Sequence, residues 1–211
     1  PHRLVLLDGY TGTAKTARLG RLQAGGVQGI DLEGLARHRG SLLGEMPGGQ
    51  PSQKGFETAL AVALHGLDPA RPVVVEAESS KIGRISLPTS LWAAMRSAPR
   101  IDVNAPEAAR AAYLAEAYRE VISDAEKLAE KLNPLRRLRG HGKVDGWIEL
   151  SRQGELVALS HALMVDHYDP AYKKSRKIDE RDVLAEVVAD TLDDAGQERA
   201  ADAIATTLRS L

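Results

Sequence analysis

The chain has 211 residues, a net charge of −1, 43% hydrophobic and 27% charged residues, and no cysteine. This length suits one large domain, or a domain with a small appendage, that buries a sizeable core. The absence of cysteine excludes a disulfide framework, a thiolate metal site and a cysteine nucleophile within these residues. Apolar runs are too short to span a bilayer and no signal peptide is recognisable, so we expect a cytoplasmic protein with no membrane partner.

The first element in chain order is a short apolar run, residues 4–8, which is typical of a buried strand in a parallel sheet. It begins so near Pro1 that we expect a domain excised from a longer protein, with a compact natural start as the alternative. A glycine-containing loop, residues 9–16, and a helical pattern over residues 17–24 follow it. This order of elements is the context that a phosphate-binding loop requires.

The next elements predict an α/β fold. Further strands are expected at residues 27–32, 71–76 and 101–103, and Ser52 is expected to cap a helix with one apolar stripe. Because strands alternate with helices, we predict a phosphate-loop NTPase-like parallel sheet flanked by helices, with ligands at the carboxyl ends of the strands.

Beyond the fourth strand the pattern becomes helical. Asn104 and Glu107 resemble a capping box, and the helix they open is expected to run to about Leu132. Further helices are predicted over residues 154–166 and 179–211, the latter broken near a glycine. The predicted domains are therefore a phosphate-loop α/β domain, residues 1–132, and a helical C-terminal extension with basic segments, residues 133–211.

The loop after the first strand nearly matches the phosphate-loop signature G-x-x-x-x-G-K-[ST]. In that signature, backbone N–H groups and a helix N-terminus surround a polyphosphate, the lysine contacts the outer phosphates and the hydroxyl binds Mg²⁺. Gly9, Lys15 and Thr16 occupy matching positions, whereas Ala14 replaces the second glycine and adds a Cβ that obstructs close approach. The alternative is an ordinary strand-to-helix turn. The predicted phosphate contacts are Gly9, Gly12, Thr13, Ala14, Lys15 and Thr16.

Acidic residues follow two of the predicted strands. Glu76 ends one strand and Glu78 comes two residues later, where a carboxylate commonly holds Mg²⁺ or orients an attacking group. Asp31 and Glu33 emerge where phosphate-loop kinases place an acceptor substrate. The alternative for Glu76 and Glu78 is solvated charge where a strand leaves the core, and the alternative for Asp31 and Glu33 is an ordinary polar loop. The predicted Mg²⁺ ligands are Thr16 and Glu76, and the predicted catalytic residues are Lys15, Asp31, Glu76 and Glu78.

Two basic runs lie in the predicted extension, at residues 136–143 and 173–177, while residues 190–202 lean acidic. Such segregation is compatible with contact to a nucleic-acid backbone, although solvated faces are the usual explanation of charge runs. The predicted RNA-binding residues are Arg136, Arg137, Arg139, Lys143, Lys173, Lys174 and Arg176. No cluster of histidines and carboxylates has zinc spacing, so no structural metal is expected.

Four ordered segments make the chain resemble the C-terminal phosphate-loop domain of bacterial tRNA 2-selenouridine synthases. They read GYTGTAKT at residues 9–16, DLEGLARHRGS at 31–41, QPSQKGFE at 50–57 and EAESSKIG at 76–83. A generic phosphate loop would not bring the other three segments with it. The likeness is dense over residues 4–88 and thinner afterwards, where HYDPAY at residues 167–172 fits the tail of the family.

The resemblance implies a transferase in which an N-terminal rhodanese-like domain with an essential cysteine precedes this domain. Such enzymes attach a geranyl group from geranyl diphosphate to wobble 2-thiouridine in tRNA, then replace the thiogeranyl group with selenium from selenophosphate. The resemblance covers only the second half of such an enzyme. By this implication the loop holds the diphosphate with Mg²⁺, and Asp31 helps to shape the thiouridine pocket. The implied substrate-binding residues are Glu33, His38, Arg39, Ser41, Gln50 and Gln53.

Two other classes of function stay open. ATP or GTP is the rival of geranyl diphosphate as the ligand of the loop. The phosphate loop together with Asp31 and Arg39 would suffice for a small-molecule kinase or NTPase. The chain could also be a non-catalytic RNA-binding module that serves a catalytic partner. The sequence makes no prediction of the oligomeric state.

Overall fold

The computed structural model describes residues 2–176 and 181–211, and the side chains of residues 175 and 176 are not described. The chain forms two compact units. The sheet unit consists of Pro1–Gly9, Ala14–Asn104 and Glu180–Leu211, and the helical unit consists of Tyr10–Thr13 and Ala105–Asp179. The units therefore divide the chain at other points than the predicted boundary at residue 132, because the chain returns to the sheet unit at its end.

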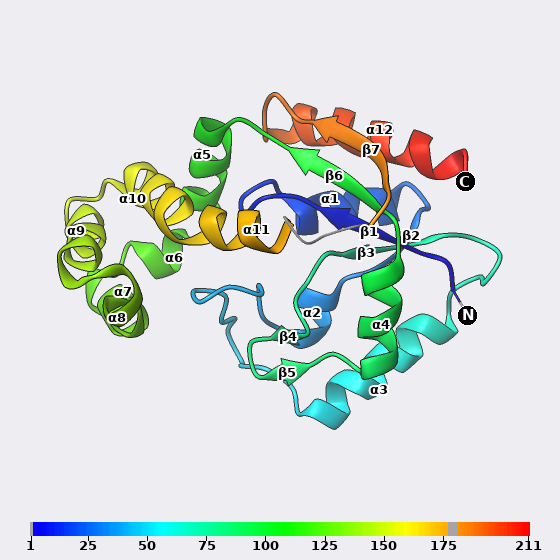
Figure 1. Cartoon of the computed structure of the whole chain (residues 1–211), viewed down its shortest axis with the longest axis horizontal. Helices are drawn as coiled ribbons and strands as arrows, with labels where there is room; N and C mark the ends of the chain where they lie inside the picture. The colour runs from blue at the N-terminus through cyan, green and yellow to red at the C-terminus, as the bar shows by residue number, and fades with distance from the viewer. Residues whose placement is uncertain (1, 177–180) are drawn as a thin grey trace. The chain divides into compact units, whose positions relative to one another are not determined.

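Five parallel strands form the main sheet, in the order β2-β3-β1-β6-β7 (Figure 1). Their bounds are Leu4–Asp8 for β1, Gln28–Ile30 for β2, Val73–Glu76 for β3, Arg100–Asn104 for β6 and Val183–Val188 for β7. Every residue of the central strand β1 is buried, as its continuous apolar run predicts. The predicted α/β fold with a parallel sheet flanked by helices is confirmed.

The helices of the sheet unit and a small hairpin enclose this sheet. They are α1 (Lys15–Ala24), α2 (Leu32–Ala36), α3 (Gln53–His65), α4 (Thr89–Ser97) and α12 (Asp194–Arg209), with the hairpin strands β4 (Lys81–Ile82) and β5 (Ile85–Ser86). Ser52 caps α3 as predicted, because its Oγ accepts a hydrogen bond of 3.0 Å from the N–H of Gly55.

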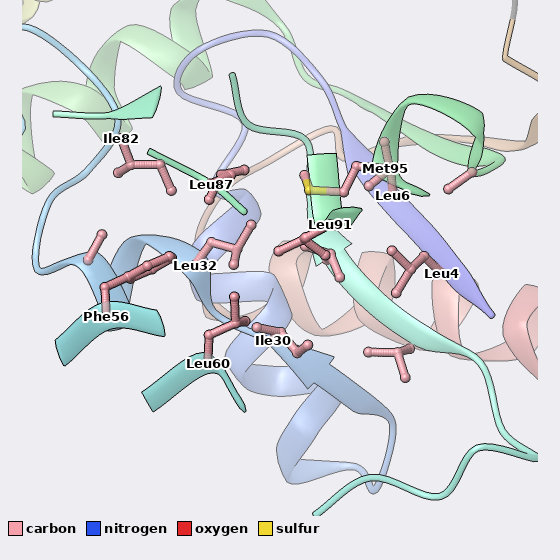
Figure 2. Packing of buried hydrophobic residues seen from close by; sticks show 14 of the residues in the cluster. Leu4, Leu6, Ile30, Leu32, Phe56, Leu60, Ile82, Leu87, Leu91 and Met95 are labelled. Atoms are coloured by element: carbon pink, nitrogen blue, oxygen red, sulfur yellow. The ribbon is translucent and has the colours of Figure 1, made fainter. Parts of the chain in front are cut away.

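One hydrophobic cluster joins α2, α3, α4 and the hairpin to one face of the sheet. Phe56 of α3, Met95 of α4 and Leu4 and Leu6 of β1 are all members of this cluster, which Figure 2 shows. Successive side chains of a strand point to opposite faces, so Val5 and the other alternate residues of β1 face away from this cluster. Glu76, the last residue of β3, is in register with Leu7 of β1, so its side chain lies on the opposite face of the sheet from this cluster, at the carboxyl ends of the strands.

The helical unit confirms the helical pattern that follows the fourth strand, in shorter pieces than predicted. Its elements are α5 (Glu107–Ala117), α6 (Arg119–Ile122), α7 (Ala125–Leu132), η1 (Asn133–Leu135), α8 (Arg136–Arg139), α9 (His141–Arg152), α10 (Leu156–Leu163), η2 (Met164–Tyr168) and α11 (Asp169–Arg176). Asp124 starts a new helix by capping α7, where it accepts a hydrogen bond of 3.1 Å from Lys127 N–H. The predicted capping box at Asn104 is wrong, because Asn104 remains in the ladder of β6 opposite Val188.

The C-terminal segment corrects the prediction of helix over residues 179–211. That prediction holds for Asp194–Arg209 but is wrong for Val183–Val188, which forms β7 beside β6. A short apolar run is ambiguous between strand and helix until its neighbours are known. Gly196 does not break the helix. Its N–H donates a hydrogen bond of 2.8 Å to Oδ1 of Asp193, the N-cap residue of α12. Within the described part of the chain, no helix is both long and apolar enough to cross a membrane.

Candidate phosphate-binding site

The loop between β1 and α1 has a left-handed backbone conformation at the position of the second signature glycine, which glycine would adopt without strain. Ala14, the N-cap residue of α1, has φ 57° and ψ 36°, in the left-handed region. A residue with a Cβ is destabilised there by roughly 1–2 kcal/mol, whereas glycine is not. The substitution at this position therefore leaves the loop geometry in place at a cost in stability.

The two signature side chains that follow Ala14 contact the protein itself. Lys15 Nζ donates a hydrogen bond of 2.8 Å to the Gly9 carbonyl, across the loop. The exposed Thr16 donates its hydroxyl proton to Glu33 Oε2 at 2.9 Å. Helix α1 has neither a side-chain cap nor an acidic residue in its first turn, so the positive end of its dipole is available to an anion.

Four carboxylates of the sheet unit interact beside Lys15 and Thr16; they are Asp31, Glu33, Glu76 and Glu78. Glu76 at the end of β3 is 1% exposed, and neither of its oxygens has a hydrogen-bond partner in the described part of the chain. Burial, followed by the charge of Glu33, raises the pKa of Glu76 to about 8, although the nearby Thr16 and Lys15 oppose the rise. Burial and the same Glu33 charge also raise the pKa of Glu78 to about 8.

A divalent cation would suit this group of side chains. A buried carboxylate without a partner is costly, and a cation would compensate it. No three histidine, aspartate or glutamate side chains of the described residues are arranged to hold a metal ion. Mg²⁺ does not require such a set, since it usually keeps several waters and binds one or two carboxylates. The assignment of Thr16 and Glu76 as Mg²⁺ ligands stays a prediction.

The second and fourth family segments meet at this group. A Cβ on Gly40, whose φ is +62°, would lie 2.7 Å from Glu78 Oε2 and 3.0 Å from Glu33 Oε1, so only glycine fits without a shift. His38 is buried, and Arg39 is exposed in the turn that includes Ser41. Asp31 caps α2, because its side chain accepts a hydrogen bond of 2.7 Å from the N–H of Gly34. Asp31 therefore has a structural role besides its predicted catalytic one.

The two glutamines of the third segment hold the hairpin in place. Gln50 Nε2 donates to the carbonyls of Ala36 at 3.1 Å and Ile82 at 2.9 Å, and its Oε1 accepts 2.8 Å from Arg84 N–H. Gln53 pairs with both backbone groups of Ser86, at 2.8 and 3.0 Å. Both amides are thus engaged with the backbone, and their direct contact with substrate stays a prediction.

The predicted RNA-binding residues all lie in the helical unit, but they differ in their partners. Arg136 is paired with Asp145 at 2.6 Å, Lys143 with Asp166 at 2.7 Å, and Arg139 donates 3.1 Å to the His167 carbonyl. In contrast, three residues are exposed and have no ion-pair partner among the described side chains; they are Arg137, Lys173 and Lys174. The side chain of Arg176 lies outside the described residues, and so does Lys177.

Sequence reasoning assigned no role to a buried ion pair in the helical unit. Arg110 of α5 and Asp169 of α11 pair at 2.8 Å, and Arg110 also contacts the tip of the loop, Tyr10–Thr13. The HYDPAY segment was a partial signal, because it contains Asp169. Arg110 lies in an ordinary alanine-rich helical pattern, so nothing in the sequence distinguishes it.

A parallel sheet whose first strand leads through this loop into a helix defines a phosphate-loop α/β domain. Residues 2–139 match the family model of the tRNA 2-selenouridine synthase AAA domain. The chain belongs to this family, as the four segments of its sequence indicate.

Individual relatives agree with the family model. The tRNA 2-selenouridine synthase of Hahella chejuensis is 51% identical over 105 residues, which are 48% of this chain and 26% of that protein. The one of Alcanivorax borkumensis is 34% identical over 197 residues, which cover 80% of this chain and 53% of that protein. The one of Chromohalobacter salexigens is 34% identical over 202 residues, which cover 81% of this chain and 52% of that protein. The chain thus spans about half the length of the last two relatives.

Among solved structures, the shikimate kinase of Bacteroides thetaiotaomicron overlaps 98% of both chains at 16% identity and a TM-score of 0.40. A score this low supports no conclusion about fold or function.

Proposed function

We propose that this chain is the phosphate-loop domain of a tRNA-modifying enzyme that converts wobble 2-thiouridine to 2-selenouridine through an S-geranyl intermediate. In this proposal the loop binds the diphosphate of geranyl diphosphate. The observation that supports it most directly is the left-handed Ala14 followed by Lys15 and Thr16 at the start of α1, in a member of this family. Selenophosphate and the rhodanese-like domain would belong to the full-length enzyme, which we expect to act in the cytoplasm.

The residues of the loop would stabilise the leaving group. The thiouridine sulfur attacks the geranyl carbon, the carbon–oxygen bond breaks with its electron pair moving to the diphosphate, and a base removes the N3 proton. Backbone N–H groups from Gly12 to Thr16 would bind the diphosphate, and Lys15 would exchange the Gly9 carbonyl for a phosphate oxygen. Mg²⁺ bound to Thr16 and to Glu76 or Glu78 would neutralise part of the diphosphate charge.

The uracil ring would bind beside the acidic group. Glu33 and Glu78 approach Gly40 of the second segment, which also contains His38 and Arg39. These side chains supply both donors and acceptors for the polar edge of a uridine. Asp31 lies at the start of α2 in the same segment.

Calorimetric titration would test the proposal with geranyl diphosphate and with ATP, each in the presence of Mg²⁺. We expect geranyl diphosphate to bind, and Lys15→Ala to weaken its binding at least about tenfold, because the substitution removes a charge-assisted hydrogen bond to phosphate. Lys54→Ala, at an exposed lysine of α3, is the matched control and should bind normally. Binding of ATP alone would favour the kinase or NTPase function, and binding of neither ligand would refute the phosphate-loop assignment.

A further inference from the structure

The buried ion pair of the helical unit contacts the loop tip, Tyr10–Thr13, which belongs to the same unit. Arg110 is 3% exposed and Asp169 is 5% exposed, and their two hydrogen bonds measure 3.0 and 2.8 Å. The same guanidinium donates a hydrogen bond of 3.1 Å to the carbonyl of Thr11 in the loop. A buried, bidentate pair has a fixed geometry, so the position of this carbonyl is fixed with it.

Four further contacts hold the tip of the loop. The Tyr10 ring lies 5.0 Å from the Arg110 guanidinium carbon and 4.3 Å, centroid to centroid, from the Tyr172 ring of α11. Thr13 closes the tip, because its hydroxyl donates 2.9 Å to the Tyr10 carbonyl. Gly12 packs so closely that a Cβ there would lie 2.9 Å from the Leu114 side chain.

We propose, resting on the function proposed above, that Arg110 and Asp169 are positioning residues that hold the loop tip, Tyr10–Thr13, in its ligand-binding conformation. Neither residue belongs to the phosphate-loop signature, and neither needs to touch the ligand. A mobile loop loses conformational entropy when it binds a ligand. A loop that is already held in place does not pay this cost on binding, so it binds its anion more tightly. Asp169 acts through Arg110, and α11 supplies both Asp169 and Tyr172 to this arrangement.

The test uses inorganic pyrophosphate with Mg²⁺ as the probe and the substitution Asp169→Asn. This change keeps the size of the side chain and removes the charge that orients Arg110. We expect pyrophosphate affinity to fall about tenfold or more, and hydrogen exchange at the Thr11, Gly12 and Thr13 amides to accelerate in the ligand-free protein. A purely structural role would lower the melting temperature and leave the affinity of the folded protein unchanged.

Asp166→Asn is the matched control, because Asp166 lies three residues earlier and pairs with Lys143 at 2.7 Å instead. It should change neither affinity nor exchange in the loop. If Asp169→Asn does not fold, Tyr172→Leu at the half-buried aromatic contact tests the same prediction. A folded variant with the pyrophosphate affinity and the loop hydrogen exchange of the wild type would overturn this inference but not the proposed function. Failure of the wild type to bind pyrophosphate would count against the proposed function, while the exchange experiment would still report on the loop.

Discussion

The Thr16 hydroxyl donates its proton to the Glu33 carboxylate at 2.9 Å, which links the start of α1 to the start of α2. A hydroxyl that donates its one proton still has two lone pairs on its oxygen. The hydrogen bond therefore turns those lone pairs away from Glu33 and leaves them for a cation. Glu33 thus orients the proposed ligand as well as adding negative charge beside it.

This geometry predicts different results for two substitutions of Thr16. Thr16→Ser keeps the hydroxyl and should keep the Mg²⁺ dependence of pyrophosphate binding. Thr16→Val has nearly the same shape without the hydroxyl, and we expect the Mg²⁺ concentration needed for half-maximal binding to rise about tenfold, because one metal ligand is removed. Titration of Mg²⁺ at fixed pyrophosphate measures both. Equal Mg²⁺ requirements for serine and valine would contradict the role of Thr16.

The acidic group predicts a stability that falls as pH rises. Burial raises the pKa of Glu76 and of Glu78 to about 8, far above the roughly 4.3 of a glutamate in an unfolded chain. Between these values the folded state binds more protons than the unfolded state, so the free energy of unfolding decreases with pH. The decrease should extend from about pH 4.5 to about pH 8 and then level off.

Glu76→Gln should reduce this pH dependence, because an amide cannot lose the proton and the charge repelling Glu78 disappears. Urea unfolding at several pH values would measure the slope, which reaches at most about 1.4 kcal/mol per pH unit for each carboxyl. Glu130→Gln, at an exposed residue of α7, is the control and should keep the wild-type slope. A Glu76→Gln protein with the full slope would show that other groups produce it.

Ala14→Gly should stabilise the protein, because the residue has a positive φ of 57°. Removing the Cβ relieves roughly 1–2 kcal/mol of strain, and the added freedom of the unfolded chain offsets about 0.4–1 kcal/mol. The net gain in the free energy of unfolding should be about 0.5–1 kcal/mol. The same change three residues later, Ala17→Gly, lies within α1 and should instead cost about 1 kcal/mol. If both substitutions changed the free energy of unfolding in the same direction, the left-handed conformation of Ala14 would be contradicted.

The sequence predicts best where a local pattern and its structural context agree. The loop of residues 9–16 could be placed from the sequence because a buried strand precedes it and a helix follows it. The strand β7 could not, since its six residues form a strand only beside β6, which is some 80 positions earlier in the chain. The hydrogen bonds of Gln50 depend in the same way on where a distant hairpin folds back. The partnership of Arg110 with Asp169 spans 59 positions and has no local signal.

The three exposed cations of the helical unit, Arg137, Lys173 and Lys174, should bind the tRNA backbone. Replacing all three with alanine should weaken tRNA binding and make the plot of log affinity against log salt less steep, by about one for each phosphate that is no longer neutralised. The matched control removes three cations that are already paired with neighbouring carboxylates in the same unit. These are Arg119 with Glu116, Lys127 with Asp124 and Arg152 with Glu126.

Both triple variants change the net charge by the same amount, so a general charge effect would lower tRNA affinity equally in the two. A specific surface predicts a reduced salt slope only for the variant of Arg137, Lys173 and Lys174. Unfolding measurements should show little change for either, because exposed ion pairs contribute only about 0–1 kcal/mol each. An unchanged slope in the first variant would mean that the tRNA binds elsewhere, since cations that bind phosphates must release counterions when they do so.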